Sequence, residues 1–401
     1  MTAPVRRAGV FAALCTLALV VPLFGTTVAV AVAAVALLGA GVVSDGPVFD
    51  LLAYPGDYED GRLYGLLTFI LAAVLLGVIA ETSSMSTAVF VGTVFLVGYG
   101  DLGEQLARQR TDHDVARVTV FCLSALVAAV AGQVATVAIT DGAGALESVL
   151  PTLVFLAASG ALLAALLRDI LMLYDDPVVM LFVGLLLWLL AELEPALGAV
   201  EITIALAITA AFGYVAYALE TASIAGMLTG VLLCLLTIIL GGYGWFAVLV
   251  SFFAIGGLST KFRYDRKEDL GVAEENNGAR GIGNVLGNAS VAIAAVLGYA
   301  ASSAAVFPID LEPTLFLFAF AGSVATAMSD TLSSEIGSIF ESPRLITTLE
   351  PVDPAPTVAS LGRARWPASA AQQSLRYSRT DCSRKSNSLV RQSSLPPDSS
   401  E

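Results

Sequence analysis

Charged residues are scarce in this chain of 401 residues. Asp, Glu, Lys and Arg together make up only 13% of it, whereas 57% is hydrophobic and the mean hydropathy is +0.81. Soluble domains contain about 25% charged residues and about 45–50% apolar ones, and a globule of this length cannot hide so much apolar surface from water. The composition therefore excludes a soluble enzyme and a disordered chain, and it predicts an all-α, polytopic membrane protein.

Basic residues, cysteine and histidine are also few. Twenty Lys and Arg stand against 34 Asp and Glu, giving a net charge of −14, and only three residues are lysines. This acidity argues against a nucleic-acid partner and indicates adaptation to high salt, as in a halophilic archaeon, with drift in a GC-rich genome as the alternative. The four cysteines are scattered and the single His113 lies in a polar loop, so neither a disulfide framework nor a zinc site is predicted.

Long apolar stretches account for most of the chain, and about 20 apolar residues suffice to cross a bilayer core as a helix. The candidate spans cover residues 8–24, 26–44, 64–80, 86–100, 118–140, 149–167, 178–191, 199–219, 222–241, 243–260, 282–306 and 314–329. Several are short or interrupted by glycine, so we expect a transmembrane helical bundle of about 11–12 helices. The first span is expected to be a retained helix and not a signal peptide.

Basic residues fall on one side of the membrane in this topology. The positions on that side are Arg6, Arg7, Arg62, Arg108, Arg110, Arg117, Arg168 and the 261–267 loop. The acidic connections near 141–147, 192–201 and 310–312 fall on the other side. Because cytoplasmic loops are enriched in Lys and Arg, we predict an integral protein of the cell membrane with a cytoplasmic N-terminus.

A polar helix face follows a basic loop in the C-terminal half. Residues 258–289 read LSTKFRYDRKEDLGVAEENNGARGIGNVLGNA. Arg280, Asn284 and Asn288 recur every four residues, so they share one face of the predicted helix. Arg and Asn can donate hydrogen bonds to phosphate oxygens, and this face is therefore a candidate phosphate-binding surface. The alternative is that the two Asn residues join neighbouring helices while Arg280 reaches the membrane interface.

A second polar cluster lies at the end of a helix rich in small residues. Residues 321–348 read AGSVATAMSDTLSSEIGSIFESPRLITT, and hydroxyls and carboxylates at such a position suit Mg²⁺. Asp330 and Glu335 are five residues apart, about 140° around a helix. They can share one metal ion only if Asp330 lies off the helix or the backbone breaks there. The alternative is a helix N-cap formed by Ser329 or Asp330.

A fainter version of this pattern occurs earlier in the chain. Residues 88–110 read AVFVGTVFLVGYGDLGEQLARQR, in which a small-residue helix is followed by Asp101 and Glu104. Our hypothesis is an internal duplication that produced two related halves, with Asp101 and Glu104 as a weaker secondary site.

From about residue 200 to 350 the chain resembles the integral-membrane family called domain of unknown function 92. The motifs GLSTKFRYDRKEDLGVAEENNGARGIGNVLGN and ATAMSDTLSSEIG…PRLITT carry the resemblance. The family includes transmembrane protein 19 and a plant phytyl-phosphate kinase of vitamin E synthesis. The second motif is also similar to the acidic signature of CTP-dependent polyprenol kinases and phosphatidate cytidylyltransferases. No family resemblance is assigned to residues 1–195, so we divide the chain into regions 1–195, 196–350 and 351–401.

The resemblance implies an integral membrane enzyme of isoprenoid lipid metabolism that phosphorylates a prenyl or phytyl monophosphate with CTP or ATP. Asp330 and Glu335 would be the catalytic carboxylates and would engage Mg²⁺. The residues implied to hold nucleotide or substrate phosphates are Lys261, Arg280, Asn284, Asn288, Ser329 and Thr331. Phosphoryl transfer needs mainly positioning and charge neutralisation from the protein. The alternatives are a membrane transporter, whose polar residues would lie near the bilayer midplane, and an inactive remnant.

The chain departs from the family after residue 349. Residues 351–401 hold seven basic and four acidic residues and no apolar span, which is a composition typical of a disordered tail. Family members continue with a phrase like PGTDGAVS. One synonymous encoding of PAPTVASLGRARWP, read two bases later, restores GTDGGVS. Our hypothesis is a frameshift near residues 352–354, and the alternative is a genuine disordered tail.

Overall fold

A computed structural model of the chain describes residues 3–171, 176–220, 222–269, 282–304, 306 and 311–337. Within these ranges the regular elements are helices and no β-strand occurs, which confirms the predicted all-α membrane bundle. Arg280 and the 351–401 tail lie outside the described residues, as does the side chain of Asn284.

The helices of the N-terminal half are α1 (Ala3–Cys15), η1 (Thr16–Leu19), α2 (Val20–Phe24), α3 (Thr26–Val42), α4 (Gly46–Leu52), α5 (Asp57–Asp60), α6 (Tyr64–Thr82), α7 (Thr87–Arg108), α8 (Asp114–Thr140), η2 (Ala143–Ala145), α9 (Leu146–Ile170) and α10 (Asp176–Glu192). Those of the C-terminal half are α11 (Ala199–Ala218), α12 (Ile224–Gly241), α13 (Tyr243–Lys261), α14 (Tyr264–Asp269), α15 (Ile282–Ser303) and α16 (Pro313–Gly337). Each of the predicted spans coincides with a helix, and the first coincides with α1, η1 and α2 in succession.

Nine helical segments of the described chain are long and apolar enough to cross a membrane. The count becomes ten if α3 and α4, which meet at an angle of 109°, form one bent span. The larger predicted number of about 11–12 came from counting every apolar stretch near the length of a span, which added α7 and α10. Helix α10 has only 17 residues, and α7 carries Asp101 and Glu104 in its last two turns.

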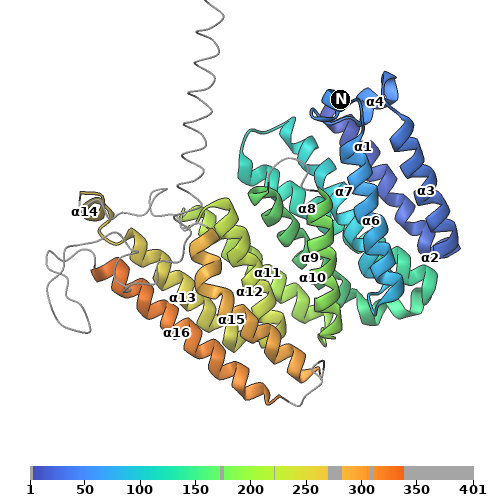
Figure 1. The fold of residues 1–401 in the computed structure, drawn as a ribbon. Helices are drawn as coiled ribbons and strands as arrows, with labels where there is room; N and C mark the ends of the chain where they lie inside the picture. Colours follow the sequence, from blue (N-terminus) through green and yellow to red (C-terminus); the bar gives the residue numbers. More distant parts are fainter. Residues whose placement is uncertain are drawn as a thin grey trace, which may run out of the picture.

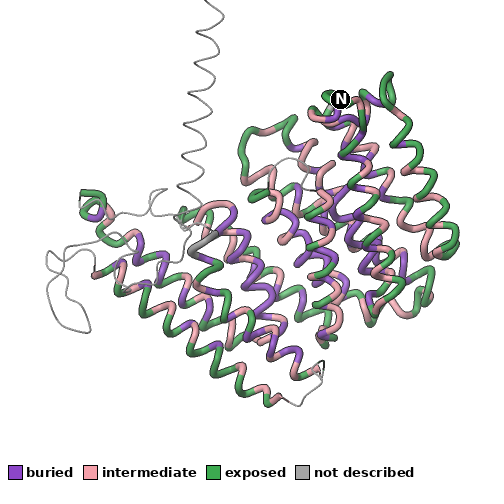
Figure 2. Tube along the Cα trace, in the orientation of Figure 1, coloured by how far each residue is buried: buried purple, intermediate pink, exposed green. Residues whose placement is uncertain are grey.

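Helix α7 is the centre of the N-terminal half. It packs against α1, α8, α9 and α10, and 14 of its 22 residues are buried. Glycines let α8 approach closely, because a Cβ at Gly100 would lie 2.8 Å from the Phe121 ring and one at Gly103 would lie 2.0 Å from Ser124 Oγ. Figure 2 shows the buried residues concentrated inside this bundle, whereas α3 is exposed along most of its length.

The two halves meet along one seam. Helix α9 contacts α11 and α12, and α12 in turn packs against α13 and α15. Figure 1 shows the N-terminal helices, blue to green, on one side of this seam and the C-terminal helices, yellow to orange, on the other. Tight turns connect neighbouring helices within each half. For example, Gly242 connects α12 to α13 and has a φ of +89°, which glycine adopts readily.

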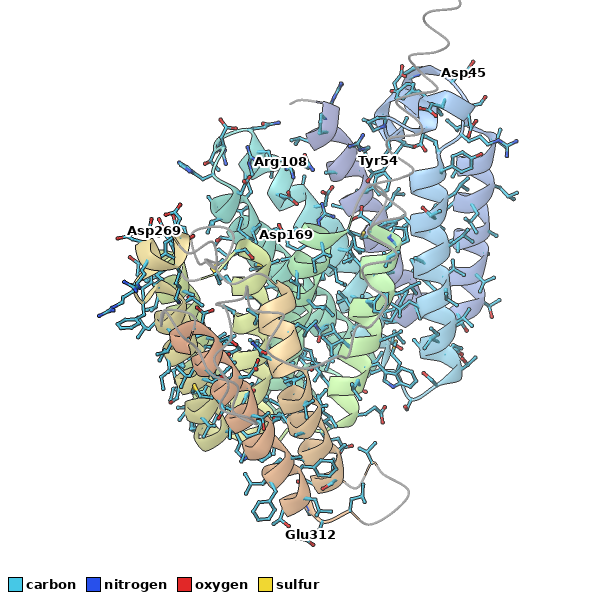
Figure 3. The ribbon with its side chains drawn as sticks, turned by 60° about the vertical axis from the view of Figure 1, so that its left-hand side comes forward. Asp45, Tyr54, Arg108, Asp169, Asp269 and Glu312 are labelled. Atoms are coloured by element: carbon cyan, nitrogen blue, oxygen red, sulfur yellow. The ribbon has the colours of Figure 1, made fainter. Side chains whose placement is uncertain are left out.

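The connections with basic residues gather at one end of the bundle. Arg108, Asp169 and Asp269 lie at the same end in Figure 3, together with Tyr54, and Glu312 lies at the opposite end. The structure thus places the ends of α7, α9 and α14 on one side, as the pattern of basic loops predicts. That this side is cytoplasmic stays a prediction.

Labelling of single cysteines tests this sidedness. In a chain whose four native cysteines have been replaced, we expect Arg110→Cys and Asp269→Cys to react with a membrane-impermeant maleimide from the same side. Glu312→Cys should react only from the other side, and all three positions are exposed in the structure. Labelling of Asp269→Cys and Glu312→Cys from the same side of sealed vesicles would contradict the arrangement.

Candidate functional site

Among the described residues of the C-terminal half, Lys267 is the most buried charged one, with 1% of the residue exposed. Its ammonium donates to Glu335 Oε2 at 2.5 Å, to the Ser259 carbonyl at 2.8 Å and to the Thr260 carbonyl at 3.1 Å. An ammonium has three protons, and each of them therefore has an acceptor. Lys267 joins α13, α14 and α16 at a single point.

Local geometry explains why this lysine turns inward. Helix α13 ends at Lys261, and the carbonyls of its last turn lack partners within the helix. Arg263 adopts a left-handed φ of +50°, and its carbonyl then accepts a hydrogen bond from the Lys267 amide at the start of α14. This sharp turn brings the Lys267 ammonium back onto the end of α13, where the helix dipole favours a positive charge.

Glu335 lies in the last turn of α16 and is also buried. A carboxylate is unfavourable near the C-terminus of a helix because the dipole there is negative. Contact with the Lys267 ammonium compensates both this effect and the loss of hydration. Removing either partner of such a pair is costly, since the other charge stays buried alone.

The other predicted residues of α16 face elsewhere. The helix is continuous from Pro313 to Gly337, so Asp330 and Glu335 diverge around it, and Asp330 is exposed while Glu335 is buried. The structure therefore does not bring these two carboxylates together as a shared metal site. Ser329 is exposed beside Asp330, and Thr331 is buried one turn before Glu335.

The predicted phosphate-binding residues Lys261 and Asn288 lie on different helices, α13 and α15. Lys261 donates to the Leu219 carbonyl at 2.5 Å and thereby ties α13 to the end of α11. Asn288 is half-buried on α15, a helix that packs against both α12 and α16. The sequence analysis did not include Lys267 among the site residues. The scarcity of lysine, which occurs at only three positions of the chain, could have drawn attention to it.

Asp101 and Glu104, the secondary site, belong to a second charged centre in the N-terminal half. Arg168 of α9 donates to Asp101 at 2.8 Å and to Glu104 at 3.3 Å, and it also pairs with Asp176 of α10. The Arg168 guanidinium lies 5.1 Å from the centre of the Phe121 ring. Arg168 thus connects α7, α9 and α10, and sequence patterns gave no sign that it meets these carboxylates.

Tyr54 and Arg7 extend this centre toward the N-terminus. The Tyr54 hydroxyl donates to Asp176 at 3.4 Å, and Arg7 lies over the Tyr54 ring at 4.0 Å while donating to the Ala53 carbonyl. Burial raises the pKa of Tyr54, and the negative charge of Asp176 raises it further. The phenol therefore stays protonated and serves as a hydrogen-bond donor.

Neither centre is a preformed metal cage. Among the described residues no group of three or more His, Cys, Asp or Glu side chains is arranged to hold a metal ion. The carboxylates of the N-terminal centre surround a guanidinium, and Glu335 faces an ammonium. Both centres are ion-pair anchors that fix the ends of helices at the basic end of the bundle.

Comparison with known proteins confirms the resemblance of the C-terminal half. The family described as integral membrane protein DUF92 matches residues 207–355. An uncharacterized membrane protein of Synechocystis is 34% identical over 118 residues, which is 29% of this chain and 43% of that protein. The chloroplastic protein VTE6 of Arabidopsis thaliana is 31% identical over 140 residues, or 35% of this chain and 40% of VTE6.

An uncharacterized membrane protein of Methanocaldococcus jannaschii is 32% identical over 117 residues, or 28% of this chain and 42% of that protein. The matched region thus spans about two fifths of the length of each of these relatives. No solved structure matches the chain. The family match covers the half that contains the Lys267 centre, and two of the three relatives are described as membrane proteins.

The Lys267–Glu335 pair predicts a specific pattern of stability changes. Lys267→Met and Glu335→Leu should each lower the free energy of unfolding by about 3–5 kcal/mol, because each leaves an unpaired buried charge. The double substitution should cost much less than the sum, since no charge is left. Thermal or denaturant unfolding in detergent micelles measures all three values. Lys261→Met is the matched control, and additive losses in the double variant would contradict the pairing.

At Arg168 we expect stability to depend on the shape of the basic side chain as well as on its charge. Its guanidinium serves three carboxylates at once, a geometry that an ammonium cannot reproduce. Arg168→Lys should therefore lower the free energy of unfolding by about 1–3 kcal/mol in the same measurement. Arg108→Lys, at an exposed pair with Glu104, should change stability by less than about 0.5 kcal/mol. Equal effects of the two substitutions would refute the central role of Arg168.

Proposed function

We propose that this protein transfers a phosphoryl group from a nucleotide to a prenyl or phytyl monophosphate at the basic end of the helix bundle. The observation that carries the proposal is the buried Lys267–Glu335 pair, which holds the charged 261–269 segment against the acidic end of α16. This pair lies in the region that matches the family, and the proposed substrate class rests on the sequence resemblance to a family that includes a plant phytyl-phosphate kinase.

Lys267 acts as a positioning residue in this proposal. Its three protons already have acceptors, so it holds the loop in place and leaves phosphate contacts to other groups. Asp330 and Ser329 are exposed on α16 and accessible to a bound nucleotide. The reaction demands charge neutralisation at the phosphates more than covalent chemistry. Arg280, Asn284 and Asn288 remain the proposed phosphate ligands.

We propose that Asp330, without Glu335, supplies the carboxylate for Mg²⁺. A metal ion held jointly by Asp330 and Glu335 does not fit, because one carboxylate is exposed and the other contacts the Lys267 ammonium. Mg²⁺ is commonly bound by one or two carboxylates together with substrate phosphates. In our proposal Asp330 is the carboxylate that meets the metal of a bound CTP or ATP, and Glu335 is a structural partner of Lys267.

The lipid substrate would approach from the bilayer. Helix α16 is apolar and largely exposed, and Phe318 is 73% exposed on it. An isoprenoid chain can lie along such a surface with its phosphate at the membrane interface. The charged end of α16 would then meet a headgroup whose tail never leaves the membrane.

Asp330→Asn tests the proposed site. Membranes that contain the full chain are incubated with labelled CTP or ATP, Mg²⁺ and prenyl phosphates, and the labelled lipid diphosphate is measured. Loss of the charge proposed to meet the metal of the bound nucleotide should reduce transfer by roughly 10²-fold, without change in thermal stability, because Asp330 is exposed. Glu312→Gln, at the opposite end of the bundle, should leave transfer unchanged.

Two results would count against this function. Equal transfer by Asp330→Asn and the unsubstituted chain would remove Asp330 from the site. Absence of transfer to any lipid phosphate, combined with solute flux in proteoliposomes, would favour the transporter.

A further inference from the structure

The non-basic end of the N-terminal bundle contains a cavity with several hydroxyl-bearing lining residues that neither charged centre uses. It has a volume of about 510 Å³ and lies between the ends of α7, α8, α9 and α10. Its polar lining side chains all end in oxygen, and the only charged ones are Asp141 and Glu194. Both of these carboxylates are exposed at its rim. A cavity with this lining attracts cations and repels anions.

Three hydroxyl groups of the lining donate hydrogen bonds to oxygens of the protein itself. Thr136 Oγ1 donates to the Gly132 carbonyl, and Ser148 Oγ donates to the Ala145 carbonyl. The single proton of the Thr140 hydroxyl has two acceptors within reach, the Thr136 carbonyl and Asp141. The proton of each of these hydroxyls is therefore used in a hydrogen bond within the protein, and the lone pairs of its oxygen stay available. Such oxygens can act as acceptors or as ligands of a hard cation.

Deeper in the same bundle lies a glutamine without partners. Gln133 is fully buried, and neither its Oε1 nor its Nε2 has a hydrogen-bond partner. It lies three residues before the cavity-lining Thr136, about one helical turn inward, since α8 rises about 1.5 Å per residue. Its side chain reaches α7, where a Cβ at Gly92 would lie 2.6 Å from it.

Ser159 repeats this situation on α9. It is fully buried, its hydroxyl is unpartnered, and it follows the cavity-lining Leu156 by three residues. Gly92 likewise follows the cavity-lining Val89 of α7 by three residues. Three helices thus carry buried polar or glycine positions one turn below the cavity. Unpaired polar groups inside a membrane are costly and mark ligand or ion sites.

We infer that this cavity and the groups below it form a binding site for a monovalent cation such as Na⁺. The neutral polar groups of the lining are hydroxyls, and the two carboxylates stay at the rim, whereas divalent ions are commonly bound through carboxylates. At the other end of this half, α7, α9 and α10 meet around the Arg168 guanidinium, whose positive charge repels cations.

The inference concerns the N-terminal half, outside residues 207–355, and it is independent of the proposed phosphoryl transfer. The test is thermal unfolding of the purified full chain in detergent, with NaCl exchanged for choline chloride at constant ionic strength. We expect a saturable rise in Tm of a few degrees with Na⁺. Gln133→Leu and Thr136→Val should abolish this rise.

Matched controls separate binding from a general effect of salt. Thr119→Val removes a hydroxyl on the exposed side of the same helix, α8, and should keep the Na⁺-dependent rise. Glu194→Gln should retain the rise but increase the half-saturating Na⁺ concentration several-fold, because the rim loses a negative charge. No difference between Na⁺ and choline, or an equal rise in Gln133→Leu and Thr136→Val, would overturn the inference.

Discussion

A charge that leaves water for the end of an apolar bundle is stable only beside an opposite charge or open backbone carbonyls. Both charged centres of the described chain satisfy this condition. Lys267 reaches the last carbonyls of α13 and a carboxylate of α16, and Arg168 reaches carboxylates of α7 and α10. Each basic residue holds together helices that are distant in sequence. The positions of these helix ends, and of any site built on them, depend on this pairing.

The sequence predicts the helices well because their signal is local. A run of apolar residues near the length of a bilayer crossing requires only neighbouring positions, and each expected span coincides with a helix. The site is harder to predict because its contacts are not local. Lys267 meets Glu335 across 68 positions, and Arg168 meets Asp101 across 67. Helix periodicity did foresee that Asp330 and Glu335 diverge on an unbroken helix, which is what α16 shows.

The two ends of the N-terminal bundle differ in the charge that they favour. At one end Arg168 lies among carboxylates and Arg7 lies over the Tyr54 ring, and at the other end the cavity is lined by hydroxyl-bearing residues and two carboxylates. The end of α16 repeats the first of these arrangements, with an acidic residue of one helix paired to a basic residue of another. This parallel between α7 and α16 is what an internal duplication would produce, and the duplication remains our hypothesis.

The packing of the N-terminal half also has a consequence for synthesis in the membrane. Helices α8, α9 and α10 each pack against the helix that precedes them, so they can be added one by one as the chain emerges. Helix α1 instead packs on α7, and α6 packs on α10 as well as on α3 and α7. Helix α1 therefore meets α7, and α6 completes its packing against α10, only after these later helices have been inserted. Insertion of α10 supplies Asp176 to Arg168 and Tyr54, and it is the event that closes this half.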